Sequence, residues 1–213
     1  MAFDLEEQEK IDALRAWWDR WGTPIMSLVT VIMLAFLAWY GWQWYQSNQS
    51  RQALGYFEVI QSASVNDDKA AATRVHEASA ILQKDYAKTP YAGRAVLLAA
   101  NFLANNNQPE AAQAQLEWLI GQAETFPDLV PVARLRMASL LADQEKYDAA
   151  LLQLANPPEA FKAVFLDRAG DVLVAQGKKQ EAVQQWKAAL EQPNLAAEFI
   201  RAVELKLSVL GGE

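Results

Sequence analysis

The alternation of apolar and polar side chains along this chain divides it near residue 50. Residues 21–50 contain no charged side chain, and their central stretch IMSLVTVIMLAFLAW (25–39) is almost wholly apolar. A helix of about 20 apolar residues, rising about 1.5 Å per residue, spans the roughly 30 Å hydrocarbon layer of a bilayer. Aromatic rings prefer the headgroup zone and cluster at both ends of the run. They are Trp17, Trp18, Trp21, Trp39, Tyr40, Trp42, Trp44 and Tyr45.

The pattern therefore predicts one transmembrane helix over 22–45, a short segment 1–21 before it and a domain 46–213 after it. A buried helix of a soluble protein would not need such a long uncharged run. A cleaved signal peptide would have a shorter apolar region that ends in small residues. The run follows a charged segment and ends in bulky aromatics, so an uncleaved anchor is favoured.

Basic residues near the span indicate its orientation. Lys10, Arg15 and Arg20 precede the span, whereas Arg51 is the one basic residue close behind it. Basic residues are enriched on the cytoplasmic side, and acidic residues count little in this rule. We therefore expect a bacterial inner-membrane protein that crosses once, with a cytoplasmic amino terminus and a periplasmic carboxy-terminal domain. The absence of cysteine is compatible with that compartment.

Beyond residue 50 the chain is rich in alanine, leucine and glutamine and lacks alternating β-branched runs, which predicts an all-α domain. Three loops, NNNQPEAA (105–112), DQEKYDAA (143–150) and AQGKKQEA (175–182), each close on an alanine. Around each loop, small and large residues recur at fixed offsets. Twelve residues before the loop alanines lie the small residues Ala100, Ala138 and Gly170. Three residues after each small residue is a leucine: Leu103, Leu141 and Leu173. Four residues after each loop alanine is a large residue: Leu116, Leu154 and Trp186.

Small residues at fixed offsets mark close approaches of helices, and the large residues fill the layers between them. The loop alanines are 38 and 32 residues apart, on either side of the 34 of a tetratricopeptide repeat. The spacing predicts stacked helical hairpins, with first helices near 92–104, 131–142 and 161–175. An earlier, distorted unit would use a helix over 47–64, and a helix over 195–209 would cap the stack. The alternative is an irregular helical bundle with accidental spacing.

Candidate chemistry is sparse. The single histidine, His76, has no cysteine or second histidine to complete a site, so a surface or packing role is favoured. No glycine-rich phosphate loop or Gly-x-Ser-x-Gly motif occurs. Asp167 and Asp171 share a helix face and could act as an acid–base pair, although a solvated face near Arg168 and Lys162 is the favoured interpretation. We expect no catalytic residue, cofactor, metal or small-molecule substrate. The chain has a net charge of −7 and no basic stripe, which disfavours nucleic acid as a partner.

Two surfaces remain as candidates for recognition. First helices of stacked hairpins line a groove, and their predicted open face would bind a peptide or a partner helix. Its residues are Arg94, Leu97, Asn101, Leu135, Ser139, Asp167 and Asp171. In the span, small and hydroxyl residues form one stripe that would let another membrane helix approach closely. The stripe consists of Thr23, Ser27, Thr30, Ala38 and Gly41.

Four stretches carry a resemblance to a known family. EQEKIDALRAWWDRWG (7–22) has the charges, aromatic pair and glycine before a membrane span, and LRMASLLADQEKYDAALLQL (135–154) fits the repeat. YAGRAVLLAANFLANNNQPEAAQAQLEWLI (91–120) and LDRAGDVLVAQGKKQEAVQQWKAAL (166–190) are similar to the repeat blocks. Over essentially its full length the chain resembles the YfgM-like ancillary subunits of the SecYEG translocon.

The resemblance implies partners in addition to membrane lipid. They are the SecYEG subunits and a membrane-anchored periplasmic chaperone of the peptidyl-prolyl isomerase type. It implies a non-enzymatic subunit that assists translocating proteins. From the residues alone, the alternatives are a scaffold for another envelope assembly (pilus, secretion or cytochrome maturation) and a hydrolase or transferase using the Asp167/Asp171 pair.

Overall fold

The computed structural model describes residues 2–63 and 70–211, with side chains from residue 8 onward, and these residues are helical without any β-strand. The chain divides into two compact units, Met1–Gln49 and Ser50–Glu213. Helix α1 (Ala2–Ala63) supplies the described part of the first unit, and its last residues belong to the second. The expected all-α fold is confirmed.

The first unit carries the uncharged run inside α1. Between Gln8 and Ala63 lies a stretch that is long and apolar enough to cross a membrane, the one such helix among the described residues. Its apolar side chains face outward; Leu34, for example, is 61% exposed. Exposed apolar side chains along a whole helix are what a lipid environment accommodates and water does not. The predicted span 22–45 falls within this helix, and its boundaries stay a prediction.

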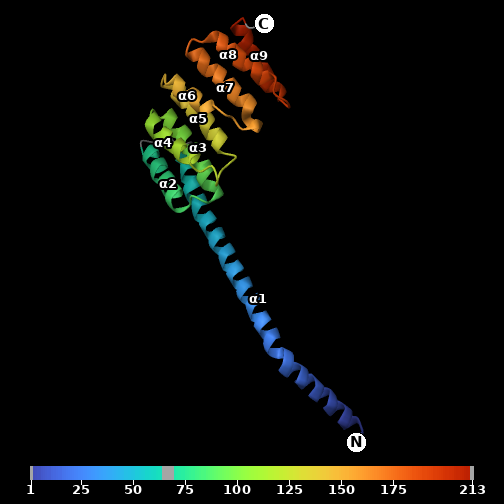
Figure 1. Cartoon of the computed structure of the whole chain (residues 1–213). Coiled ribbons are helices and arrows are strands. Elements are labelled where there is room, and N and C mark those ends of the chain that lie inside the picture. The colour runs from blue at the N-terminus through green and yellow to red at the C-terminus, as the bar shows by residue number, and fades with distance from the viewer. Residues whose placement is uncertain (1, 64–69, 212–213) are drawn as a thin grey trace. The chain divides into compact units, whose positions relative to one another are not determined.

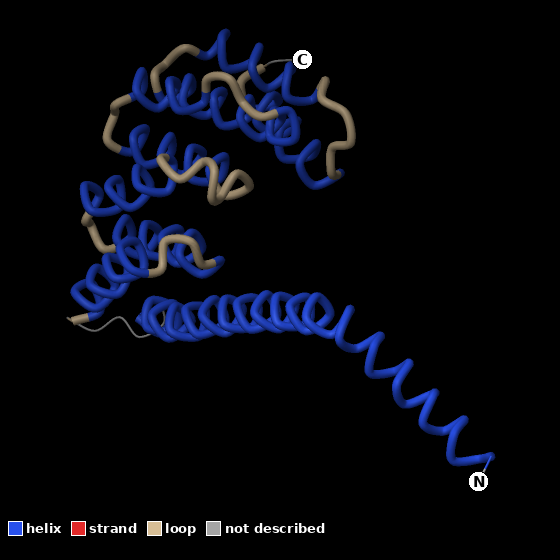
Figure 2. Tube along the Cα trace, turned by 60° about the horizontal axis from the view of Figure 1, so that its bottom comes forward, coloured by secondary structure: helices blue, strands red, loops and turns tan. Residues whose placement is uncertain are grey.

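The second unit is a stack of helical hairpins (Figures 1 and 2). Its helices are α2 (Ala71–Asp85), α3 (Pro90–Asn105), α4 (Pro109–Ile120), α5 (Val130–Asp143), α6 (Tyr147–Leu154), α7 (Lys162–Ala175), α8 (Lys179–Leu190) and α9 (Ala197–Val209), with a short 3-10 turn η1 (Glu159–Phe161) before α7. The pairs α3–α4, α5–α6 and α7–α8 form the hairpins, and α5 also contacts α4 and α7. The three first helices match their predicted ranges, and α9 is the predicted capping helix.

The end of α1 contacts the start of the stack, as the predicted distorted unit requires. The Tyr56 ring lies 5.8 Å from that of Tyr86 and the Phe57 ring lies 5.9 Å from that of Tyr91, measured between centroids. Ile60 is fully buried. This part of α1 therefore takes the place of a first helix.

The positions aligned from the sequence form the core of the hairpins. All twelve are buried: Ala100, Ala138, Gly170, Leu103, Leu141, Leu173, Ala112, Ala150, Ala182, Leu116, Leu154 and Trp186. At Gly170, a Cβ atom would collide with the indole of Trp186. Glycine is thus required where the largest filler, Trp186, replaces the leucine of the other two hairpins.

The three hairpin loops have the same backbone geometry. Asn107, Glu145 and Gly177, each five residues before the loop alanine, have φ angles of 55°, 59° and 84°. The next amide in each loop donates to the leucine carbonyl five residues earlier, at 2.9, 2.9 and 2.8 Å. This is the bond that closes a helix in the Schellman motif. The repeat is therefore present in the backbone as well as in the core.

Candidate functional site

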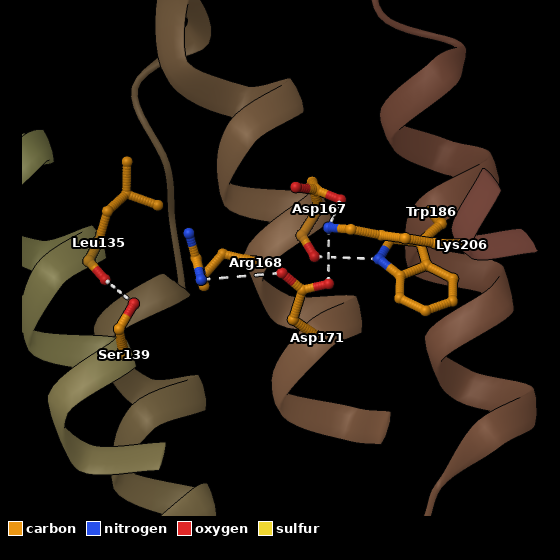
Figure 3. A network of polar contacts seen from close by, with 7 residues as sticks. All are labelled: Leu135, Ser139, Asp167, Arg168, Asp171, Trp186 and Lys206. Carbon is orange, nitrogen blue, oxygen red and sulfur yellow. Dashed lines mark hydrogen bonds and ion pairs between the residues drawn. The ribbon is translucent and has the colours of Figure 1, made fainter. Parts of the chain in front are cut away.

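The predicted groove residues of the second unit fall into three groups. On α3, Arg94 and Asn101 are exposed, but Leu97 is only 8% exposed and belongs to the core. On α5, Leu135 and Ser139 are partly buried, and the Ser139 hydroxyl donates to the Leu135 carbonyl at 3.1 Å (Figure 3). On α7, Asp167 and Asp171 face α9.

A pocket of about 320 Å³ between α3, α4 and α5 brings Asn101 and Ser139 together. Its apolar lining is made by Ala100, Ala104, Ala112, Leu116 and Leu140. Its polar lining is made by Asn101, Asn105, Arg136, Ser139 and Asp143. Small side chains at the hairpin contact leave this space, and the outward positions of α3 and α5 supply the polar groups.

Sequence reasoning missed Asn105, Arg136 and Asp143. Asn105 could have been found, because it lies one turn after Asn101 on the same face of α3. Arg136 could not, because its role depends on a contact between hairpins: Nη1 donates to the Leu97 carbonyl at 2.7 Å. Leu97 therefore contributes a backbone acceptor that ties α3 to α5, and the expectation of an open side chain there is wrong.

Asp167 and Asp171 are joined to α9 by a single ammonium group. Lys206 Nζ lies 2.7 Å from Oδ1 of each aspartate (Figure 3). The Asp167 side chain is only 15% exposed. Trp186 Nε1 donates to the Asp167 carbonyl at 3.1 Å, and the Lys206 ammonium lies 5.7 Å from the Trp186 ring centroid. The favoured interpretation, that Asp167 and Asp171 lie on a solvated helix face, is wrong, because α9 covers that face.

Burial governs the electrostatics of the pair. The pKa of Asp167 is raised above its ordinary value of 3.8, chiefly by loss of hydration. The neighbouring Asp171 raises this pKa further, while the Lys206 hydrogen bond and charge, and then Arg168, lower it. Arg168 also lies 3.8 Å from Asp171. The two carboxylates thus bind Lys206 and hold α9 on the last hairpin, whereas an acid–base pair would have carboxyl groups free of such a partner.

The described ranges offer no candidate metal site among the titratable residues. No group of three or more histidine, cysteine, aspartate or glutamate side chains is placed to hold a metal ion there. His76 is exposed on α2, in agreement with the predicted surface role.

In the first unit, two hydroxyl residues of the predicted stripe, Ser27 and Thr30, hydrogen-bond to the backbone of their own helix. Ser27 Oγ donates to the Thr23 carbonyl at 2.9 Å, and Thr30 Oγ1 donates to the Met26 carbonyl at 2.8 Å. A Cβ atom on Gly41 would meet no neighbour within 4 Å. The hydroxyl hydrogens of Ser27 and Thr30 are therefore used within α1, and these residues offer a partner their shape and free oxygen lone pairs.

The stripe borders an open hollow of about 570 Å³ on α1. Trp18, Gly22, Thr23, Met26, Ser27 and Thr30 line it. The Trp18 ring packs against Gly22, where a Cβ atom would lie 3.1 Å from that ring.

These features define a class of protein: a stack of tetratricopeptide-like hairpins that follows one candidate membrane anchor. Residues 15–212 match the family model described as a tetratricopeptide repeat-like domain. The chain is 30% identical over 193 residues to the ancillary SecYEG translocon subunit of Neisseria gonorrhoeae, covering 90% of this chain and 91% of that protein.

Two further relatives bear the same name. The chain is 26% identical over 211 residues to the ancillary SecYEG translocon subunit of Aggregatibacter actinomycetemcomitans, covering 99% of this chain and 100% of that protein. It is 33% identical over 106 residues to that of Escherichia coli, covering 49% and 50%. The chain belongs to the family of ancillary SecYEG translocon subunits, and the resemblance in its sequence is confirmed.

Proposed function

We propose that this protein is an ancillary subunit of the SecYEG translocon in the bacterial inner membrane. One observation carries the proposal: the similarity to the Neisseria subunit extends over 90% of the chain, too much for the repeats alone to account for it. In this proposal α1 anchors the subunit, residues 1–21 lie in the cytoplasm and residues 46–213 lie in the periplasm. Three basic residues before the span against one close behind it support this orientation.

The periplasmic unit binds a membrane-anchored chaperone of the peptidyl-prolyl isomerase type and so assists translocating proteins. The open part of the predicted groove supports binding: Arg94 and Asn101 on α3 are exposed, and Leu135 and Ser139 on α5 are partly exposed. Asp167 and Asp171 contribute by fixing α9 and so the end of the groove. The protein acts by binding, as a non-enzymatic subunit.

The anchor takes part in docking through its stripe. Apolar surface gains little by moving from lipid to another helix, so close packing selects the partner. Small residues on one face, next to the hollow at Gly22, favour such packing. We assign contact with the channel subunits to Thr23, Ser27, Thr30, Ala38 and Gly41.

Blue native electrophoresis of mildly solubilised membranes tests the proposal. The protein is expected in the same band as a SecYEG channel subunit, and Ser27→Leu, Ala38→Leu and Gly41→Leu together should weaken that band. The matched control places leucine on the opposite face of α1, at Ile25, Ile32 and Phe36, and should leave the band unchanged. Deletion of the periplasmic repeats should remove the chaperone and spare the channel subunit.

Other results would contradict parts of the proposal. Copurification with pilus, secretion or cytochrome-maturation proteins in place of the channel would overturn it. Full comigration with an unrelated membrane helix in place of residues 22–45 would show that the anchor is a simple tether.

A further inference from the structure

Residues 8–21 of α1, which precede the predicted span, carry a stripe of large apolar side chains along one face. At 3.6 residues per turn the stripe occupies roughly 120° of the helix circumference. Its members, all exposed, are Ile11, Leu14, Trp17, Trp18 and Trp21. An exposed stripe of this kind needs an apolar environment that the rest of the first unit does not supply.

The opposite face of the same segment is charged. It carries Glu9, Asp12, Arg15, Asp19 and Arg20. Arg15 Nη1 lies 3.9 Å from Asp12 Oδ1, and both side chains are open to solvent. Lys10 lies beside the stripe, where its long apolar stem can follow the apolar face while its ammonium group reaches water or a headgroup. With three acidic and three basic side chains, residues 8–21 have no net charge.

A proline follows this segment at the start of the apolar run. Pro24 lies inside α1 and has no N–H to donate to the Arg20 carbonyl four residues earlier. A proline inside a helix also crowds that carbonyl and bends the helix. Helix α1 is bent in its amino-terminal half (Figure 1). Residues 8–21 can therefore leave the axis of the span.

A straight continuation of the span would carry much of the stripe into water. Ile11 lies ten residues before Trp21, about 15 Å along the helix axis. The headgroup layer on each side of a bilayer is only about 5–8 Å thick. Laid flat on the membrane, the same segment would bring the whole stripe to the boundary between headgroups and acyl chains.

Lipid fits this stripe better than a protein partner does. Three of its five side chains are indoles, which combine an apolar ring with an N–H donor and accumulate at the level of the headgroups. The stripe is also continuous, within one helix, with the candidate span, so the bilayer surface is always within its reach. The lack of net charge means that no anionic partner is required.

A second copy of the chain is the main rival occupant. The spacing of Ile11, Leu14, Trp18 and Trp21 by three and four residues is that of a coiled-coil seam. Such seams favour Ile, Val and Leu, whereas this one would place Trp18 and Trp21 against their own copies. The two indoles therefore favour the membrane surface over a paired helix.

We propose that residues 8–21 form an amphipathic helix that lies on the membrane surface, bent away from the span at Pro24. Ile11, Leu14 and the three indoles enter the boundary of the acyl chains, and the charged face remains in water. This inference goes beyond the proposed function. It requires that α1 crosses the membrane, and it requires no contact with the channel.

Spin labels on the full-length protein test the inference in nanodiscs of phosphatidylcholine that hold one copy each. The chain has no cysteine, so a label can be attached at Ile11→Cys, Leu14→Cys, Asp12→Cys or Ala16→Cys, one position at a time. Electron paramagnetic resonance compares label collisions with oxygen, which concentrates in lipid, and with a nickel complex, which stays in water. We expect a severalfold higher ratio of oxygen to nickel collisions at the first two positions than at the last two. Added phosphatidylglycerol should leave these ratios unchanged.

Two charge variants with the label at Ile11→Cys test the stripe itself. Leu14→Glu places a charge on the stripe and should lower the ratio toward its value in water. Ala16→Glu adds the same charge on the polar face and is the matched control, which should leave the ratio unchanged. Circular dichroism confirms that each variant keeps its helical content.

A backbone variant tests the bend. Pro24→Ala restores an N–H donor for the Arg20 carbonyl and should straighten α1, which lowers the ratio at Ile11→Cys. Ile25→Ala, which leaves the backbone donors as they are, is the control and should not lower it. An unchanged ratio in Pro24→Ala would overturn the bend.

Water exposure at all four labelled positions would overturn the inference, because residues 8–21 would then project from the membrane. A requirement for phosphatidylglycerol would also overturn it. So would a ratio that rises only when two copies share a disc, or only when channel subunits are added, since a protein would then occupy the stripe. The discs contain no channel, so loss of the shared band in native electrophoresis would contradict the proposed function alone.

Discussion

At the scale of single residues, one backbone conformation is used three times with three different side chains. Asn107, Glu145 and Gly177 occupy equivalent left-handed positions in the hairpin loops. Glycine adopts this conformation freely and asparagine tolerates it, whereas an ordinary side chain costs about 1–2 kcal/mol there. Glu145 is exposed and forms no ion pair within the described residues, so the second loop carries this cost.

Replacing Glu145 with glycine is therefore expected to stabilise the protein. The relief of backbone strain exceeds the entropy that glycine loses on folding, which leaves a net gain of about 0.5–1 kcal/mol. The apparent melting temperature of the full chain in detergent, followed by circular dichroism, should rise. Gly177→Glu is the reciprocal variant and should lower it. A fall for Glu145→Gly would mean that the strain is absent.

Asp167 gives a second prediction for a single residue, through its raised pKa. Because the folded-state pKa lies above the unfolded value, the stability that Asp167 contributes is fully present below about 3.8 and is lost as the pH rises through the folded-state pKa. The unfolding free energy of the unaltered protein minus that of Asp167→Asn should therefore fall as the pH rises from just below 4 toward neutrality. Urea titrations at a series of pH values measure this difference.

The contribution of Lys206 can be separated in the same experiment. Lys206→Met removes the charge that lowers the pKa of Asp167, so the fall should extend to higher pH in that background. A pH-independent difference in both backgrounds would show that burial does not shift this carboxyl group.

At the scale of helices, the alternation of small and large residues determines which face packs inward. Ala138 is fully buried in α5, whereas the neighbouring Ser139 lines the pocket. Extra volume at a close helix contact forces strain of about 1–3 kcal/mol. Ala138→Leu should lower the melting temperature, and Ser139→Leu should change it much less. Equal effects of the two substitutions would show that the packed face has been misassigned.

The same scale shows why part of the groove could not be predicted. Helix phases and loop positions follow from local periodicity, so the hairpins and their core positions were predictable. Lys206 contacts Asp167 and Asp171 from 39 and 35 residues away, and no periodicity within α7 signals a partner at that distance. Arg136 likewise reaches Leu97 from 39 residues away. The exposure of a groove residue was thus predictable where it depends only on the face of its own helix. It was not predictable where a helix from a distant part of the chain covers that face.

At the scale of the whole molecule, the basic residues around the span predict topology. With Lys10, Arg15 and Arg20 before it, alkaline phosphatase fused after the last residue should be active, because that enzyme requires the periplasm. A cytoplasmic reporter at the same position should be inactive. Moving the three basic residues to positions just after the span should reduce phosphatase activity, and unchanged activity would show that another signal sets the orientation.

The second unit has two apolar cores of unequal size, and this gives it a weak end. Trp186, Val203 and Leu207 form a cluster separate from the large core that extends from Ala53 to Val172. A helix held by a small separate cluster opens at a lower free energy than the structure around it. Amide hydrogens of α9 should therefore exchange with deuterium sooner than those of α3 and α5, before global unfolding. The last hairpin would then expose the carboxylates of Asp167 and Asp171 in short openings, while the rest of the stack stays folded.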